Sequence, residues 1–140
     1  MPEPFRLSFQ VRDYECDLQG VVNNAVYQNY LEHARHEFLK SRGLDFATLF
    51  AQGVNLVLVR AELDYRRSLR PGDAFEVHVR VEPEGRVRMV FVQEIVKHDG
   101  TTVLTARMTG TALDARGRPR IPEGLWERLL EADPAILPDA

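Results

Sequence analysis

The sequence predicts an α+β fold in which a five-stranded antiparallel sheet wraps around one long central helix. Three observations predict it. Residues 5–11 alternate apolar and polar side chains, as a half-buried strand does. Apolar residues recur at helical spacing over residues 24–41. Between residues 54 and 113 the chain is rich in strand-forming residues with short breaks, which favours antiparallel pairing.

The first strand and the long helix are the clearest elements. We expect Asn23 or Asn24 to cap the helix N-terminus by accepting a backbone N–H bond, and Gly43 to end the helix with a positive φ. The helix would span about 27 Å at 1.5 Å per residue.

The second strand, residues 54–65, begins with an apolar run and then alternates, so we expect it to lie centrally in the sheet. The remaining predicted elements are short helices at residues 46–52 and 125–130, strands at residues 75–81, 87–96 and 102–113, and a frayed end at residues 134–140.

The sheet is the only large apolar surface available to cover the helix. Its outer face is expected to carry valines and a methionine, and one edge strand is left without a partner. A monomer would expose both features, so we expect the protein to self-associate.

The composition predicts one domain over residues 1–140. Of the 140 residues, 44% are hydrophobic, enough for a single core. The net charge of -3 argues against a nucleic-acid partner. No apolar run approaches the roughly 20 residues of a membrane helix, so no membrane partner is expected. Cys16 is the single cysteine and cannot form an internal disulfide, so we expect a cytoplasmic protein.

The loop before the long helix is the most informative stretch for function. The first-turn N–H groups of a helix have no intrahelical partner and can polarise a carbonyl oxygen. Asp17 lies a few residues before them, where its carboxylate could attack the polarised carbon or activate water. Gly20 would let a substrate approach the backbone closely. The residues alone leave open that Asp17 only caps a turn.

Other candidate residues have simpler explanations. Glu15 fits a solvated or ion-paired acid, although it remains a second candidate for catalysis. Cys16 has no adjacent base, so a small half-buried residue is the better interpretation. His33 and His36 are typical of a solvated helix face, and no metal site is predicted. Arg86 and Arg88 could grip phosphate groups or could simply be solvated.

The loop and the helix together resemble a known family. Residues 11–27 read Val-Arg-Asp-Tyr-Glu-Cys-Asp-Leu-Gln-Gly-Val-Val-Asn-Asn-Ala-Val-Tyr, and the helix continues with Tyr30, His33, Arg35, Glu37 and Leu39. This stretch resembles the hotdog-fold thioesterases of the 4-hydroxybenzoyl-CoA thioesterase type. Its sequence is most similar to the plant acyl-lipid thioesterases and their bacterial relatives.

The resemblance implies a catalytic carboxylate at Asp17 and a polarising backbone N–H at Asn24, with Gly20 between them. It implies hydrolysis of an acyl thioester of coenzyme A or of acyl carrier protein, with Asp17 as nucleophile or general base. The coenzyme A or phosphopantetheine is part of the substrate, so no separate cofactor is expected. Homodimers or homotetramers are implied, with each site between subunits.

Candidate substrate-binding residues are Asn23, Tyr27, Arg86 and Arg88, the two arginines for nucleotide phosphates. Asn23 and Asn24 replace the aromatic pair of aryl-CoA enzymes, which favours a fatty or 3-oxoacyl chain. Val21 replaces a histidine found in many relatives. The alternative function is a non-catalytic protein with the same fold that binds acyl thioesters, and a hotdog dehydratase would need a histidine before His33.

Overall fold

The computed structural model describes residues 3–130, so the predicted frayed end at residues 134–140 lies outside the described residues. The elements, in chain order, are β1 (Phe5–Gln10), the 3-10 helix η1 (Asp13–Glu15), α1 (Asn24–Ser41), α2 (Phe46–Ala51), β2 (Asn55–Tyr65), β3 (Ala74–Glu84), β4 (Arg88–Lys97), β5 (Thr102–Leu113) and α3 (Leu125–Leu129). All strand pairings are antiparallel, in the order β1-β3-β4-β5-β2. The predicted α+β class is confirmed.

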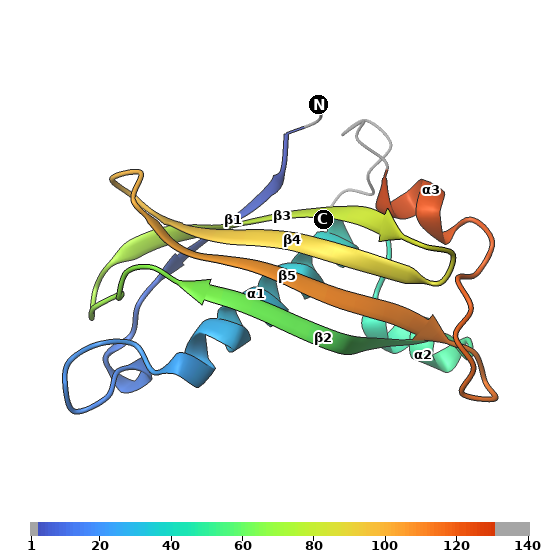
Figure 1. The fold of residues 1–140 in the computed structure, drawn as a ribbon, viewed down its shortest axis with the longest axis horizontal. Helices are drawn as coiled ribbons and strands as arrows, with labels where there is room; N and C mark the ends of the chain where they lie inside the picture. The colour runs from blue at the N-terminus through green and yellow to red at the C-terminus, as the bar shows by residue number, and fades with distance from the viewer. Residues whose placement is uncertain (1–2, 131–140) are drawn as a thin grey trace.

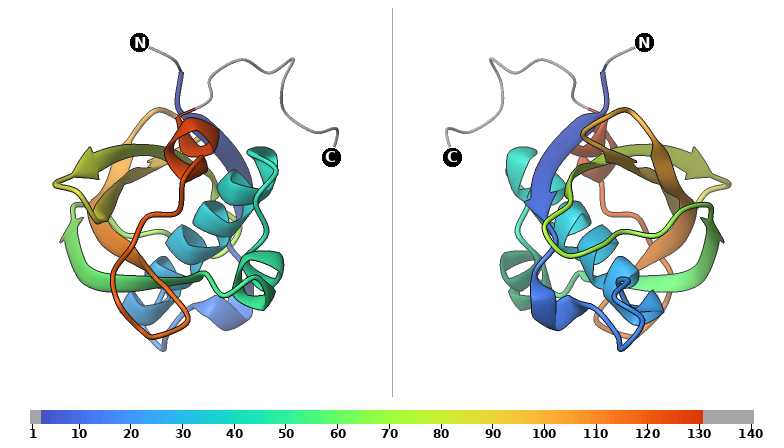
Figure 2. Two further views of the ribbon diagram at one scale, coloured as in Figure 1. Left: turned by 90° about the vertical axis from the view of Figure 1, so that its right-hand side faces the viewer. Right: turned by 90° about the vertical axis from the view of Figure 1, so that its left-hand side faces the viewer.

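The sheet curls around α1, as the end-on views of Figure 2 show, while Figure 1 looks onto the sheet with α1 behind it. The buried side chains of α1 are Tyr27, Tyr30, Leu31, Ala34, Phe38 and Leu39, which repeat at helical spacing. They pack against inward-facing residues of the strands, including Val77 and Ile95. Gly43 follows the helix with φ 73°, the left-handed geometry that ends helices, as predicted.

The prediction that β2 lies centrally in the sheet is wrong, because β2 is an edge strand paired only with β5. Its apolar start is explained differently. The short helix α2 packs beside β2, and Leu49 of that helix is buried. Further along, Leu58 and Val59 remain 45% and 48% exposed. A run of apolar residues therefore marks an open edge here and not a strand with neighbours on both sides.

The prediction of a methionine on the outer face of the sheet is also wrong. Met89 and Met108 are each 1% exposed and belong to the core around α1. The register places Val90 and Val92 on the opposite face of β4, so the predicted outward valines are confirmed.

One extra residue interrupts the alternation of β2. The register with β5 shifts between Leu58 and Arg60, so Val59 forms a β-bulge. Leu58 pairs with Gly110 before the bulge, and Ala61 pairs with Met108 after it. Both halves of β2 therefore turn apolar residues toward α1, although Leu58 and Ala61 are three positions apart, an odd separation that would put them on opposite faces of a regular strand.

The contact of α1 with the sheet yields a stability prediction. Leu31 is fully buried, so Leu31→Ala would leave a cavity and lower the free energy of unfolding by about 2–5 kcal/mol. Urea denaturation measures this. Leu18→Ala is the matched control, because Leu18 is fully exposed and its truncation should cost less than about 0.5 kcal/mol. Equal midpoints for the two variants would contradict a core built on α1.

Candidate active site

A small hairpin carries the candidate catalytic acid to the start of α1. Its backbone rungs are Asn23 N–H to Glu15 O at 3.1 Å, the Cys16–Val22 bridge, and Asp17 N–H to Val21 O at 2.9 Å. Val22 is buried and its N–H donates to Leu69 O. Asp17 therefore lies two residues from the rung that leads into α1, about 7 Å along the hairpin.

Asp17 sits in the tight turn of this hairpin with its carboxylate exposed. Oδ1 accepts hydrogen bonds from the N–H of Gln19 at 2.8 Å and of Val21 at 3.4 Å. Gly20 holds φ 77°, a backbone conformation that suits glycine, and its N–H donates to Asp17 O. No described residue donates to Oδ2. One carboxylate oxygen is thus fixed in direction while the other is available to a ligand or a water.

The start of α1 differs from the predicted cap. Asn23 is the N-cap residue, but its side chain accepts no capping hydrogen bond. Its Nδ2 instead donates to Glu15 O at 3.4 Å, so the expectation of an Asn23 or Asn24 side-chain cap is wrong. The first turn therefore keeps free N–H groups, and both Asn23 and Asn24 are exposed. Within residues 3–130, the backbone N–H groups of Asn24 and Ala25 have no hydrogen-bond partner, whereas that of Val26 bonds to Asn23 O.

Glu15 makes hydrogen bonds that connect the hairpin, η1 and α1. Its Oε1 accepts from Tyr30 OH at 2.8 Å and from the Arg12 N–H at 2.8 Å. Its side chain is only 12% exposed. Its backbone carbonyl accepts hydrogen bonds from the backbone N–H and from the side-chain Nδ2 of Asn23. Burial, reinforced by the bond to Glu15, raises the pKa of Tyr30 well above its ordinary value. Glu15 thus joins η1, the hairpin and α1, and the structure gives it a positioning role.

This role predicts that Glu15→Ala lowers the free energy of unfolding by about 1.5–3 kcal/mol, the cost of losing hydrogen bonds to a charged group. Glu15→Gln should lose less, because its amide oxygen can still accept from Tyr30. Chemical denaturation of the two variants measures the difference. Asp13→Ala, an exposed acid in the same segment, is the control and should change stability little. An unchanged free energy of unfolding in Glu15→Ala would show that the carboxylate does not stabilise the fold.

Tyr27 and Cys16 are engaged in packing. Tyr27 is 3% exposed, and its hydroxyl accepts the Leu69 N–H at 2.9 Å, which ties the chain after β2 to α1. A substrate contact by Tyr27 therefore stays a prediction. Partial burial, with the nearby Asp13 carboxylate second, raises the pKa of the Cys16 thiol. A raised pKa disfavours the reactive thiolate.

Arg86 and Arg88 do not lie near Asp17 within one chain. The hairpin adjoins the start of β3, where Val11 N–H donates to Asp73 O, whereas both arginines follow the end of that strand. β3 has 11 residues and so spans about 35 Å at roughly 3.3 Å per residue. Figure 1 shows the loop before α1 and the β3–β4 turn at opposite ends of the sheet.

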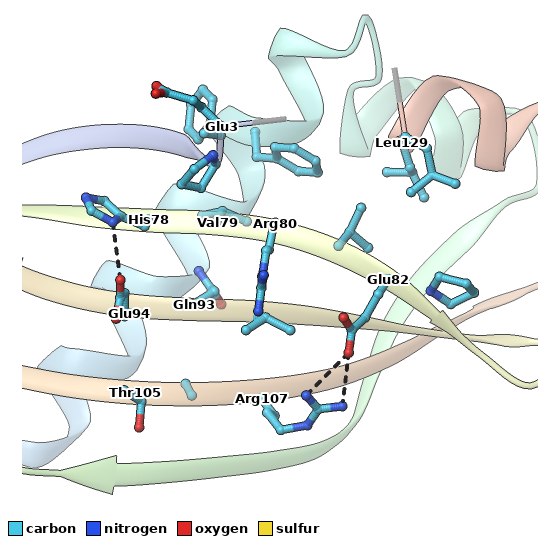
Figure 3. A pocket seen from close by; sticks show the side chains of 18 of the residues that line it. Glu3, His78, Val79, Arg80, Glu82, Gln93, Glu94, Thr105, Arg107 and Leu129 are labelled. Atoms are coloured by element: carbon cyan, nitrogen blue, oxygen red, sulfur yellow. Dashed lines mark hydrogen bonds and ion pairs between the residues drawn. The ribbon is translucent and has the colours of Figure 1, made fainter. Parts of the chain in front are cut away.

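A cavity of about 840 Å³ on the sheet does not include the hairpin or the first turn of α1. Figure 3 shows charged side chains from neighbouring strands along it. His78 lies 3.5 Å from Glu94, and Arg107 lies 3.4 Å from Glu82. These side chains pair with one another across the strands, as expected on a solvated sheet face.

A second cavity, of about 150 Å³, lies between α1, α2 and the β2 side of the sheet. Arg35 lines it and donates from Nη1 to Gln93 Oε1 at 3.0 Å, while Gln93 Nε2 donates to Leu31 O. Gln93 is 2% exposed on the inner face of β4. Sequence reasoning missed this pair, although a glutamine among the apolar inward residues of β4 was a signal that could have found it.

His36 also lines this second cavity, with its ring centroid 4.5 Å from that of Phe46. Burial lowers the pKa of His36 below its ordinary value of 6.5. The folded protein therefore binds this proton less readily than the unfolded chain. We expect the contribution of His36 to the free energy of unfolding to be constant above pH 6.5. This contribution should fall as the pH drops from 6.5 toward the lowered pKa of His36 in the folded protein.

Denaturation midpoints of the wild type and of His36→Gln, compared across this pH range, test the expectation. The difference between their denaturation midpoints should become smaller as the pH falls. A difference independent of pH would contradict the lowered pKa.

Comparisons with known proteins extend these observations. A family model described as the thioesterase-like superfamily matches residues 11–129. The acyl-acyl carrier protein thioesterase ATL3 of Arabidopsis thaliana is 38% identical over 132 residues, covering 93% of this chain and 70% of that protein. The acyl-CoA thioester hydrolase YbgC of Escherichia coli is 27% identical over 110 residues, covering 79% of this chain and 82% of that protein.

Among solved structures, a hypothetical protein from Aquifex aeolicus superposes with a TM-score of 0.84 at 33% identity, covering 90% of this chain and 99% of that one. Within residues 3–130, no helix combines the length and the apolar character needed to cross a membrane.

Proposed function

Because the chain belongs to the thioesterase-like superfamily, has its hotdog fold and is an acyl thioester hydrolase, we propose that it hydrolyses a fatty or 3-oxoacyl thioester with the Asp17 carboxylate as nucleophile or general base. The products are the free acid and the thiol of the carrier. The observation that carries this proposal is the Asp17 carboxylate, which has one anchored oxygen and one free oxygen beside the unpaired first-turn N–H groups of α1.

The geometry supports the following sequence of events. The thioester carbonyl oxygen accepts the Asn24 N–H, and the positive end of the α1 dipole stabilises the negative charge that develops on it. Asp17 Oδ2 either attacks the carbonyl carbon to form an anhydride, which water then opens, or takes a proton from the attacking water. In both routes the C–S bond breaks and the thiolate leaves and is protonated. Gly20 leaves room for the substrate beside the turn.

Two carriers fit this proposal. The names of the Arabidopsis and Escherichia coli relatives specify acyl carrier protein and coenzyme A, respectively. In either case the pantetheine arm belongs to the substrate, and we assign no separate cofactor. Asn23 and Tyr27 are proposed to contact the substrate near the thioester. The proposed location is the cytoplasm.

The proposed active unit is a homodimer or homotetramer. The free edge of β2, with Leu58 and Val59 exposed, is suited to pair with a second copy. Arg86 and Arg88 lie too far from Asp17 to serve the site of their own chain. We therefore assign them to the nucleotide phosphates of a substrate bound at the site of another subunit.

Asp17→Asn tests the proposed chemistry, because it keeps the Oδ1 acceptor and removes the charge. We expect thiol release from acyl-CoA and acyl carrier protein thioesters to fall by about 10²–10⁴-fold. The control is Asp13→Asn, which changes an exposed acid in the same segment and should leave turnover unchanged. Circular dichroism verifies folding of both variants.

Two results would contradict the proposal. Full activity of Asp17→Asn would remove Asp17 from the reaction. Saturable binding of these thioesters by the wild type without thiol release would support a non-catalytic binding protein instead.

A further inference from the structure

α1 covers only part of the inner face of β2, where Leu56 and Leu63 pack against the core and their neighbours on the same face do not. The register places Leu58, Ala61 and Tyr65 of β2 on the side that faces α1, opposite Gly110, Met108 and Leu104 of β5. All three are nevertheless exposed, Leu58 by 45% and Tyr65 by 47%. Most inward residues of the middle strands, in contrast, are buried. We call these three residues the β2 strip, an apolar track open to a ligand.

The β2 strip joins two places already described. At one end, Tyr65 OH donates to Asn24 O at 3.5 Å, and its ring lies 5.6 Å from that of Tyr27, beside the start of α1. At the other end, Leu58 lines the 150 Å³ cavity that also contains Arg35. Arg35 is 11 residues beyond Asn24 on α1, so these two residues lie about 16 Å apart along the helix at 1.5 Å per residue. This separation matches the length of a medium-length acyl chain that starts at Asn24 and ends in the cavity.

The cavity has apolar walls and a cation on its rim. Its apolar residues are Leu39, Phe46, Leu56, Met89 and Phe91. No carboxylate of the described residues is within ion-pairing distance of the Arg35 guanidinium, which makes one hydrogen bond, to Gln93. The guanidinium has five N–H donors in a fixed fork, so several remain for a ligand.

Gln93 fixes the direction of this fork. It is buried and bonded to Leu31 O, so it holds the Arg35 side chain against α1. Glu32 on the same rim offsets part of the positive charge, which favours a neutral oxygen acceptor over a full carboxylate.

We propose that the Arg35 cavity recognises an oxygen atom at the far end of a medium-length acyl chain, so that the enzyme prefers thioesters whose chain ends in a hydroxyl or carbonyl group. This inference rests on the proposed function and names the substrate class of that site. Arg35 then acts as a specificity residue distant from the chemistry at Asp17. The distance from Asn24 to Arg35 selects for acyl-chain length, since a short chain bound at Asn24 cannot reach Arg35.

The test compares matched pairs of coenzyme A thioesters. Dodecanoyl-CoA and ω-hydroxydodecanoyl-CoA form the long pair, and hexanoyl-CoA and ω-hydroxyhexanoyl-CoA form the short pair. The readout is the ratio of kcat/KM within each pair, so any loss of folded protein cancels. Arg35→Met should lower the long-pair ratio by roughly tenfold or more, the expected loss of a hydrogen bond to a charged group. Arg35→Lys should restore part of it.

Two controls accompany this comparison. Lys40→Met removes a positive charge from the same helix outside the cavity and should leave both ratios unchanged. The short-pair ratio should be the same in all variants. An unchanged long-pair ratio in Arg35→Met, or an equal change in Lys40→Met or in the short pair, overturns the proposal. A shift in dimer dissociation without a change in ratio also overturns it and assigns Arg35 to a contact with a second copy.

The failure of the proposed function is distinguishable from the failure of this inference. If the wild type releases no thiol, calorimetric binding of S-dodecyl-CoA and S-(ω-hydroxydodecyl)-CoA replaces turnover. A preference for the hydroxyl analogue that Arg35→Met abolishes supports the cavity assignment without hydrolysis. Equal binding of the two analogues by the wild type overturns it.

Discussion

The burial of one side of α1 against the inner face of the sheet is the constraint on which the rest of the structure depends. Leu31, Ala34 and Phe38 are essentially fully buried, and their exposure would cost more than any surface contact could offset. The sheet curls to cover them, and this packing holds α1 in place from Tyr27 onward. The hairpin with Asp17 is therefore held at the helix start by the same packing that stabilises the fold.

Hydrogen bonds from two side chains then position the segments that pack around α1. Glu15 connects three segments through Tyr30, Arg12 and Asn23, so the position of the Asp17 turn does not depend on the turn alone. Gln93 has a corresponding role further along α1, where a single buried amide joins β4 to the helix backbone. Glu15 thus positions the hairpin that carries Asp17, and Gln93 binds the Arg35 guanidinium directly.

Local patterns in the sequence predicted the local structure well. The alternation at the start of the chain, the helical period of α1 and the bounds of β5 all match the structure because each depends on neighbouring residues. The pairing of β2 could not be read in this way, since an apolar run looks the same whether a strand, a helix or a second subunit covers it. The Asp17 loop and the helix start were found from sequence.

The contacts that organise the site were not found from sequence. Arg35 and Gln93 are separated by 58 residues, and Gln93 and Leu31 by 62, so no local pattern relates them. The side chain of Asn23 looked like a cap but bonds to Glu15 instead, because the hairpin brings that carbonyl within its reach.

The bulge at Val59 has a consequence for the evolution of this chain. Because strand alternation has a period of two, an insertion or deletion of one residue in either half of β2 would turn the outward residues of that half toward α1, including the charged Arg60 and Glu62 after the bulge. Changes of length in β2 should therefore persist only in compensating pairs, or by gain or loss of the bulge itself. The turn after β5 at residues 114–118 has no such parity and can vary in length among descendants of the same ancestor.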